Sequence, residues 1–173
     1  MLLVAVLREA ADRPLAPHED ELLRPMILRS SNKAARAVYA GYGDRALTSV
    51  AAAARMRHFQ PVGAVFEARI TAADQARFFL RIDRLVPARH RAYARELLGG
   101  IVERQRWGVA SVAERRGFTV SFKGGWRKGI THQAALLERD GRRVALAVLT
   151  SDEPTLAYGS ATLAGVAARV LHP

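Results

Sequence analysis

The feature that most constrains this fold is an alternating segment, residues 119–126, which ends in two adjacent glycines. Polar and apolar residues alternate along it, which predicts a strand buried on one face. Gly124 and Gly125 predict that another backbone or a ligand comes close to this strand. Lys123 offers a positive charge and Trp126 a backbone N–H, so the strand could hold an anionic substrate. The alternative is an ordinary glycine bulge beside a surface lysine.

The rest of the chain is mostly helical before this strand. Helical spacing and capping signals predict helices over residues 1–11, 18–29, 33–42, 44–56, 71–85, 87–105 and 156–171. Two further strands, residues 131–138 and 143–150, flank Asp140-Gly141, a strong hairpin signal. An irregular connection over residues 57–70 and a loop around Trp107 and Gly108 complete the chain.

This order of elements predicts one α/β (α+β) domain over residues 1–173. Residues 1–115 form a mostly helical lobe, and residues 116–173 form an antiparallel sheet with a closing helix. The length of 173 residues and the 50% hydrophobic content suit a single sizeable core. The absence of cysteine excludes disulfides and thiolate metal sites. No pair of the five histidines has metal-ligand spacing, so we predict no metal and no cofactor.

The chain is strongly basic, with a formal net charge of +11 and 24 arginines against 3 lysines. A high isoelectric point is typical of nucleic-acid-binding proteins. Here the arginines are spread along the chain among acids, and no basic run is interleaved with aromatic residues. The sequence therefore argues against nucleic acid as a partner and keeps it only as the last alternative.

The N-terminal residues 1–7 are apolar but do not form a signal peptide. No basic segment precedes them, and Arg8 and Glu9 end the run well short of a membrane span. Localisation is therefore not predicted from this chain. The better interpretation is a buried helix, and a domain that begins in its core indicates that an N-terminal portion is missing.

A second polar motif, Ser30-Ser31-Asn32, lies at a helix junction upstream of the Lys123 strand. Together the two motifs resemble S-x-N and K-T-G of the serine β-lactamases and penicillin-binding DD-peptidases. The segment from Met26 to Leu47 and the closing strands and helix also resemble this family, so the similarity covers nearly the whole chain. It is strongest to class A β-lactamase-like serine hydrolases of actinobacterial type, in which F-K-G-G-W recurs.

The resemblance implies the transpeptidase-like fold and a division of roles in acyl transfer by a serine nucleophile. It implies that Ser30 relays a proton to the leaving nitrogen, and that Lys123 orients Ser30 and attracts the substrate carboxylate. The two side chains should then lie within reach of each other. Substrate binding would involve Asn32, Gly124, Gly125 and the Trp126 backbone N–H. Without the resemblance, Ser30 would be a helix-capping serine and Asn32 a turn residue.

The sequence also departs from the family pattern. The only serine with a lysine three residues later is Ser30, and Ser30-Ser31-Asn32 already matches S-x-N, so the separate nucleophilic motif S-x-x-K that the family carries upstream is absent. Residues 1–5 resemble the helix that follows this motif, which implies an N-terminally truncated chain without the nucleophile and the first two strands. Gly124 replaces the hydroxyl residue of K-T-G. Glu67 does not match E-x-x-L-N, and we interpret it as a solvated loop acid rather than a deacylating base.

In its full-length form, the protein would hydrolyse a β-lactam or peptide-like amide through an acyl-enzyme. This chain alone would be inactive. A non-catalytic protein that keeps the cleft is the main alternative, and a basic nucleic-acid binder is the lesser one. Family members are typically exported to the cell envelope or secreted. Self-association through an exposed sheet edge is a further expectation. Trp107 and Trp126 either wall the cleft or fill the core.

Overall fold

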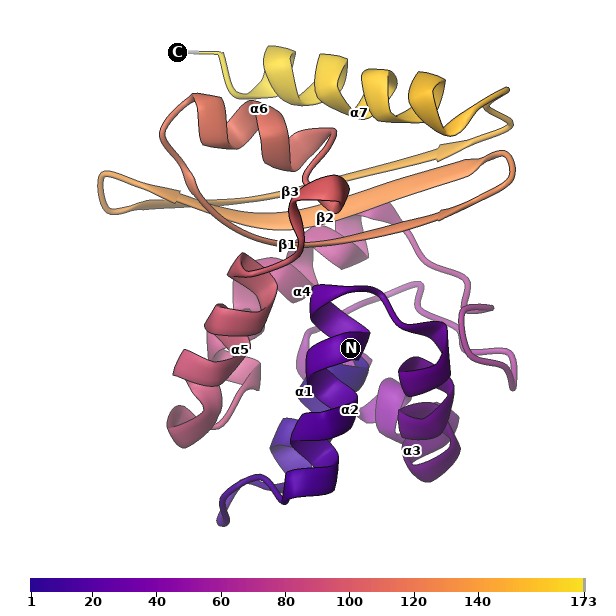
Figure 1. Cartoon of the computed structure of the whole chain (residues 1–173), viewed down its shortest axis with the longest axis vertical. Coiled ribbons are helices and arrows are strands. Elements are labelled where there is room, and N and C mark those ends of the chain that lie inside the picture. Colours follow the sequence, from indigo (N-terminus) through magenta and orange to yellow (C-terminus); the bar gives the residue numbers. More distant parts are fainter. Residues whose placement is uncertain (173) are drawn as a thin grey trace.

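The computed structural model describes residues 1–172, and Pro173, the last residue of the predicted domain, lies outside the described residues. Helices and a sheet alternate in layers (Figure 1). The helices of the lobe lie below the sheet, and α6 and α7 cover its upper face. The helices are α1 (Leu2–Glu9), α2 (Pro17–Leu28), α3 (Asn32–Ala53), α4 (Ala72–Leu85), α5 (Arg91–Gly99), α6 (Val109–Arg115) and α7 (Leu156–Val170), with short 3₁₀ turns η1 (Ala88–His90) and η2 (Glu103–Gln105).

The sheet is antiparallel in the order β1-β2-β3 and confirms the three predicted strands. They are β1 (Thr119–Arg127), β2 (Ile130–Arg139) and β3 (Arg142–Ser151). Asp140 and Gly141 join β2 to β3 with positive φ values of 52° and 74°, as a primed hairpin turn requires. The α/β fold predicted from the order of elements is therefore correct.

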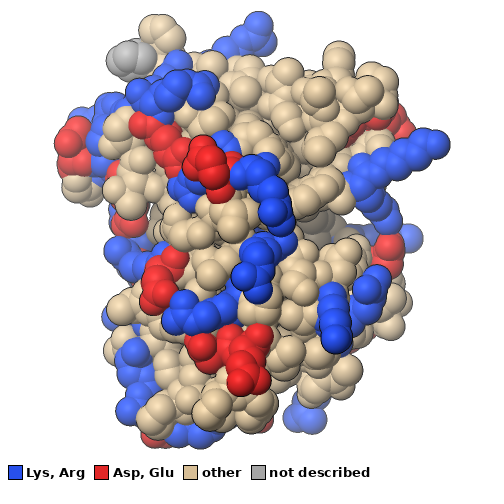
Figure 2. Space-filling model, viewed as in Figure 1, with Lys and Arg blue, Asp and Glu red and all other residues tan. Residues whose placement is uncertain are grey.

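Apolar side chains from both layers form the core. Residues 3–7 of α1 are all buried, so the apolar start of the chain is a core helix, as predicted. Phe122 and Leu136 of the sheet are also fully buried. On the outer surface, acidic and basic side chains are intermixed over the helical lobe, whereas the region over α7 carries few charges (Figure 2).

Two helix predictions need correction. The helix expected over residues 87–105 ends at Gly99, and the chain then turns through Gly100 and η2. Two successive glycines favour an end here, because they lower helix propensity and fit C-terminal caps. The loop expected before β1 contains α6, a short helix whose valines and alanines are buried. The two helices predicted over 33–42 and 44–56 are confirmed: α3 spans both, and they meet at Gly43, where the backbone is non-helical with a φ of 58° and a ψ of −166°.

The irregular connection over residues 57–70 is tied to the lobe and to the sheet. Asp44 of α3 accepts a hydrogen bond from the Gly63 N–H at 2.8 Å. At its far end, Glu67 forms an ion pair with Arg127 of β1 at 3.0 Å. Asp74 of α4 accepts hydrogen bonds from backbone N–H groups at the start of the connection. These contacts hold the segment beside the cleft between the two layers.

Candidate functional site

Ser30 lies in the short link between α2 and α3. The side chain of Ser31 caps α3 by accepting a hydrogen bond from the Ala34 N–H at 3.3 Å. The capping serine is thus Ser31, not Ser30. Ser30 itself has a φ of 55°, a left-handed backbone conformation that is costly for a residue with a Cβ. Its hydroxyl is therefore not committed to the helix end and can face the sheet.

Ser30 and Lys123 meet across the boundary between the helical lobe and the sheet. The Lys123 Nζ donates to the Ser30 Oγ at 2.5 Å and to the Gly124 carbonyl at 2.7 Å. The prediction that these two side chains lie within reach is confirmed. The Ser30 Oγ in turn donates to the Gln105 Oε1 at 2.8 Å, so the serine links an amine to an amide.

Gln105 is a site residue that the sequence did not reveal. Its side chain is 4% exposed, and its Nε2 donates to the Arg29 carbonyl at 3.1 Å. This second hydrogen bond fixes which amide atom faces Ser30, because the nitrogen is already used on Arg29. A single glutamine after a glycine pair carries no pattern of its own, so only the folded structure identifies it.

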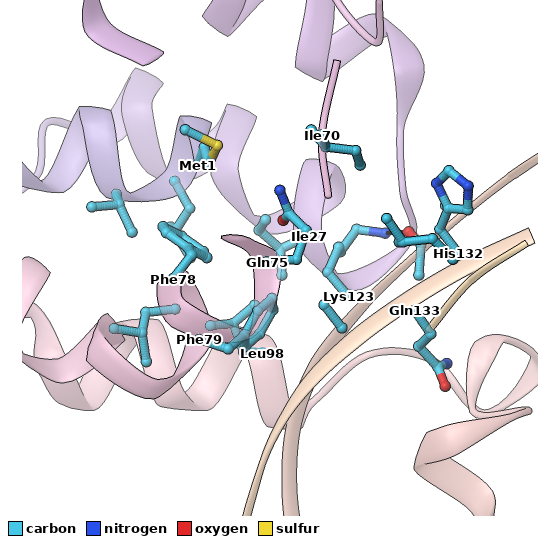
Figure 3. A pocket seen from close by; sticks show the side chains of 17 residues that line it. Met1, Ile27, Ile70, Gln75, Phe78, Phe79, Leu98, Lys123, His132 and Gln133 are labelled. Carbon is cyan, nitrogen blue, oxygen red and sulfur yellow. Dashed lines mark hydrogen bonds between the residues drawn. The ribbon is translucent and has the colours of Figure 1, made fainter. Parts of the chain in front are cut away.

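Lys123 points into a pocket of about 230 Å³ between the lobe and the sheet (Figure 3). The pocket is lined mainly by apolar side chains of α1 and α4, and also by His132 and Ala134 of β2 and by Lys123, Gly124 and Gly125 of β1. Adding a Cβ to Gly125 would meet nothing within 4 Å, so this glycine leaves open space above the strand. Gln133 points away from the pocket on the far side of β2 (Figure 3).

Burial lowers the pKa of Lys123 to about 8. Within residues 1–172, no carboxylate forms an ion pair with this amine. Burial, and to a lesser extent the charge of Lys123, lowers the pKa of the Met1 α-amino group in the same pocket to about 5. At neutral pH the pocket thus holds a largely protonated lysine without an anionic partner, which suits a ligand carboxylate.

Trp107 accounts for the glycine at position 124. A Cβ on Gly124 would lie 3.4 Å from the Trp107 ring, and Trp107 packs edge-to-face against Trp126 at 5.8 Å between centroids. Because side chains alternate along a strand, Gly124 and Trp126 face the side opposite Lys123. The sequence had left open whether the two tryptophans wall the cleft or fill the core. In the structure the pair packs on the face of β1 that is turned away from the Lys123 pocket.

We expect Gly124→Thr to destabilise the fold rather than restore a family-like motif. The larger side chain must displace the Trp107 ring, and overpacking of this kind costs about 1–3 kcal/mol. Urea unfolding of the wild type, Gly124→Thr, Trp107→Ala and the double variant measures the coupling between the two positions. Because the ring is already gone in Trp107→Ala, adding threonine there should cost clearly less. Equal costs in both backgrounds would contradict the packing explanation.

Asn32, a predicted substrate-binding residue, and Glu67, interpreted as a loop acid, both lie on the surface. Asn32 is the first residue of α3 and is exposed. Among the described residues, Lys123 bonds Ser30 and the Gly124 carbonyl rather than the Asn32 amide. Glu67 is half exposed and paired with Arg127, so it is a surface acid, as interpreted from the sequence.

Neither a metal-binding cluster nor a membrane-spanning helix is found within residues 1–172. No group of three or more His, Cys, Asp or Glu side chains within residues 1–172 comes together in a way that could hold a metal ion. In the same part of the chain, every helix is too short or too polar to cross a bilayer.

Comparison with known proteins places this arrangement in a family. The sequence model of the β-lactamase enzyme family matches residues 6–172. The solved structure of a β-lactamase from Sphaerobacter thermophilus matches 98% of this chain and 78% of its own, at 17% identity and a TM-score of 0.79. That of a β-lactamase from Streptosporangium roseum matches 98% of this chain and 81% of its own, at 16% identity and a TM-score of 0.78. The structure of PBP-A matches 98% of this chain and 76% of its own, at 14% identity and a TM-score of 0.78. A search of curated protein sequences gives no match.

Proposed function

This chain belongs to the β-lactamase enzyme family, and from that premise we propose that it forms the carboxylate-binding and proton-relay part of a serine acyl-transfer site. The substrate class is a β-lactam or a peptide-like amide, whose carboxylate would enter the Lys123 pocket. The observation that supports this most directly is the 2.5 Å contact between Lys123 Nζ and Ser30 Oγ, in a pocket without an anionic partner.

The proposed roles follow from which groups must give and receive a proton during the reaction. When the amide C–N bond of the substrate breaks and its acyl group stays on the nucleophile, the leaving nitrogen must gain a proton. The Ser30 hydroxyl would give its proton to that nitrogen and recover one from the protonated Lys123. In this structure the Ser30 proton points to Gln105, so rotation of the hydroxyl toward the substrate starts the relay. The Trp126 backbone N–H would bind the developing oxyanion, and Asn32 the substrate amide.

The residues of this chain do not supply the nucleophile. The only Ser-x-x-Lys among the 173 residues is Ser30–Lys33, where Lys33 is exposed and Ser30 bonds Lys123 and Gln105 instead. We therefore propose that this polypeptide by itself does not form an acyl-enzyme. With Glu67 on the surface, it also has no evident base for deacylation. A non-catalytic binding protein is therefore the second candidate. It is favoured by the half-buried Lys123, which forms no ion pair within residues 1–172 and can hold a carboxylate without any chemistry.

Lysine NMR tests the carboxylate site directly, because the chain has only three lysines. In protein with ¹³C-labelled lysine side chains, the signal that disappears in Lys123→Arg belongs to Lys123. Its titration midpoint should lie near pH 8. Addition of a penicillin should raise this midpoint, because a bound carboxylate favours the charged amine.

Binding should then weaken at least about tenfold in Lys123→Ala, since hydrogen bonds to charged groups contribute about 1.5–3 kcal/mol. Lys128→Ala is the matched control: it removes the same charge from an exposed residue on the β1–β2 hairpin, and its affinity should stay near that of the wild type. Equal losses in the two variants, or an unchanged Lys123 signal at saturating penicillin, would contradict the proposed site.

A further inference from the structure

Gln105 lies in a turn that is packed closely against the helical lobe. This turn, residues 99–105, follows α5 and contains η2. The Val102 N–H donates to the Leu28 carbonyl at the end of α2, at 3.1 Å. A Cβ on Gly100 would lie 3.3 Å from the Leu28 side chain, so the turn has little room to move away from α2. The backbone that carries Gln105 is therefore fixed relative to the link that carries Ser30.

Arg106 ties the same turn to the sheet. Its Nη1 donates to two backbone carbonyls of the turn, at 2.9 and 3.1 Å, and its Nε donates to Glu114 of α6 at 2.8 Å. Its guanidinium lies over the Phe122 ring, 5.2 Å from the ring centroid. Phe122 directly precedes Lys123 in β1. Two adjacent residues, Gln105 and Arg106, thus contact both halves of the Ser30–Lys123 pair.

The Gln105 amide can meet Ser30 in only one orientation. Its Nε2 donates to the Arg29 carbonyl, so its Oε1 faces Ser30 and can only accept. A serine hydroxyl has a single proton to donate. Because this proton goes to Gln105, the lone pairs of the Ser30 Oγ are left for the Lys123 amine, whose Nζ lies 2.5 Å away.

We propose that Gln105 is the positioning residue of the relay, an inference that rests on the proposed function. It keeps the Ser30 proton directed away from Lys123, so the lysine acts as the proton donor to Ser30. When the substrate C–N bond breaks, the leaving nitrogen replaces Gln105 as the acceptor of the Ser30 proton. Ser30 takes a proton from Lys123 as its own O–H bond breaks. The neutral lysine then regains a proton from solvent.

This role predicts that the side chain at position 105 controls the titration of Lys123. Hydrogen bonds in a chain polarise one another, so an acceptor beyond Ser30 favours the charged amine. Gln105→Met keeps a similar size without the acceptor and should lower the Lys123 titration midpoint. Gln105→Glu places an opposite charge two hydrogen bonds from the amine and should raise the midpoint by about 1 pH unit.

The other titratable groups near Lys123 are the same in all these variants. The Met1 α-amino group beside α1 and His132 of β2 share its pocket, whereas α4 contributes only Gln75 and apolar side chains. Among the ion pairs of residues 1–172, none joins a carboxylate to Lys123. A shift of the midpoint therefore reports the change at position 105.

Lysine NMR of these variants separates positioning from mere structural support. Both variants lose the hydrogen bond to the Arg29 carbonyl. If that bond only supported the turn, the pocket would open in both, and reduced burial would raise both midpoints. Positioning predicts opposite shifts instead. Gln105→Leu repeats the apolar test with a second shape. Gln60→Glu and Gln60→Met, at an exposed glutamine, are the matched controls and should leave the midpoint unchanged.

The penicillin titration of the wild type distinguishes failure of this inference from failure of the proposed function. An unchanged midpoint in Gln105→Glu, or a raised one in Gln105→Met and Gln105→Leu, would overturn the role of Gln105. The carboxylate site would still stand if penicillin raises the wild-type midpoint. Opposite shifts in the Glu and Met variants without any response to penicillin would support the contact of Gln105 with the relay and contradict the proposed function.

Discussion

Intact-mass spectrometry of the 173-residue chain after incubation with a labelled penicillin is expected to show no covalent adduct. The nucleophile and its base act as a unit in serine acyl transfer, and loss of either typically lowers turnover on the order of a millionfold. The only Ser-x-x-Lys spacing is Ser30–Lys33, but Lys33 is exposed and Ser30 is held by Lys123 and Gln105 in a relay position. Binding without acylation is therefore the expected behaviour.

The prediction also requires that no serine outside the site is acylated. Ser111 donates its hydroxyl to the Gly108 carbonyl, and Ser121 is 7% exposed within β1. No hydrogen bond joins either hydroxyl to a possible general base among the described residues, so neither should be acylated. A penicilloyl adduct on the wild type would contradict the prediction, and peptide mapping would then identify the acylated serine.

The complementary experiment adds a nucleophilic motif to the chain. A chain extended before Met1 by a helix-forming segment with Ser-x-x-Lys should become labelled, provided that the helix continues into α1. In that longer chain, Lys123→Ala should sharply reduce labelling, whereas Lys128→Ala should not. Labelling that is indifferent to Lys123 would remove this lysine from the proposed mechanism.

The parts of the fold that sequence predicted are those set by local chemistry. Alternation around Phe122 gives β1, and the positive φ values that Asp140 and Gly141 accept give the hairpin. Thr71 caps α4 as expected, by accepting a hydrogen bond from the Asp74 N–H at 3.2 Å. The Ser30–Lys123 contact was predictable because two short motifs resemble a known pair, although they are far apart in the chain.

The parts that sequence missed depend on contacts between distant elements. Gln105 matters because it reaches Ser30 and Arg29, and neither contact has a local pattern. Trp107, in the link between η2 and α6, meets the position of a Cβ on Gly124 only when this link is packed against β1. The same holds for Asp74: its place in the first turn of α4 was recognised as part of a cap, but its main partners lie 16 and 17 residues upstream.

Asp74→Ala should lower the free energy of unfolding by about 3–5 kcal/mol, because it removes the acceptor of several buried donors at once. The Asp74 carboxylate is fully buried and accepts hydrogen bonds from the backbone N–H groups of Arg57 and His58 at 2.8 and 2.7 Å. The Arg77 side chain also pairs with it at 2.8 Å. With a melting point shift of about 2–4 °C per kcal/mol, the loss should be near 10 °C.

The pH dependence of stability separates this charge effect from a packing defect. Burial alone would raise the pKa of Asp74, but its hydrogen bonds from Arg57, His58 and Arg77 outweigh burial and lower the pKa below the ordinary 3.8. The stabilisation is therefore complete above pH 3.8 and is lost as pH falls through the lower folded pKa. Asp20→Ala, which removes an exposed carboxylate paired with Arg24, is the control and should cost less than about 1 kcal/mol. If the two variants unfold at similar urea concentrations at pH 7, the connection over residues 57–70 is not held by Asp74.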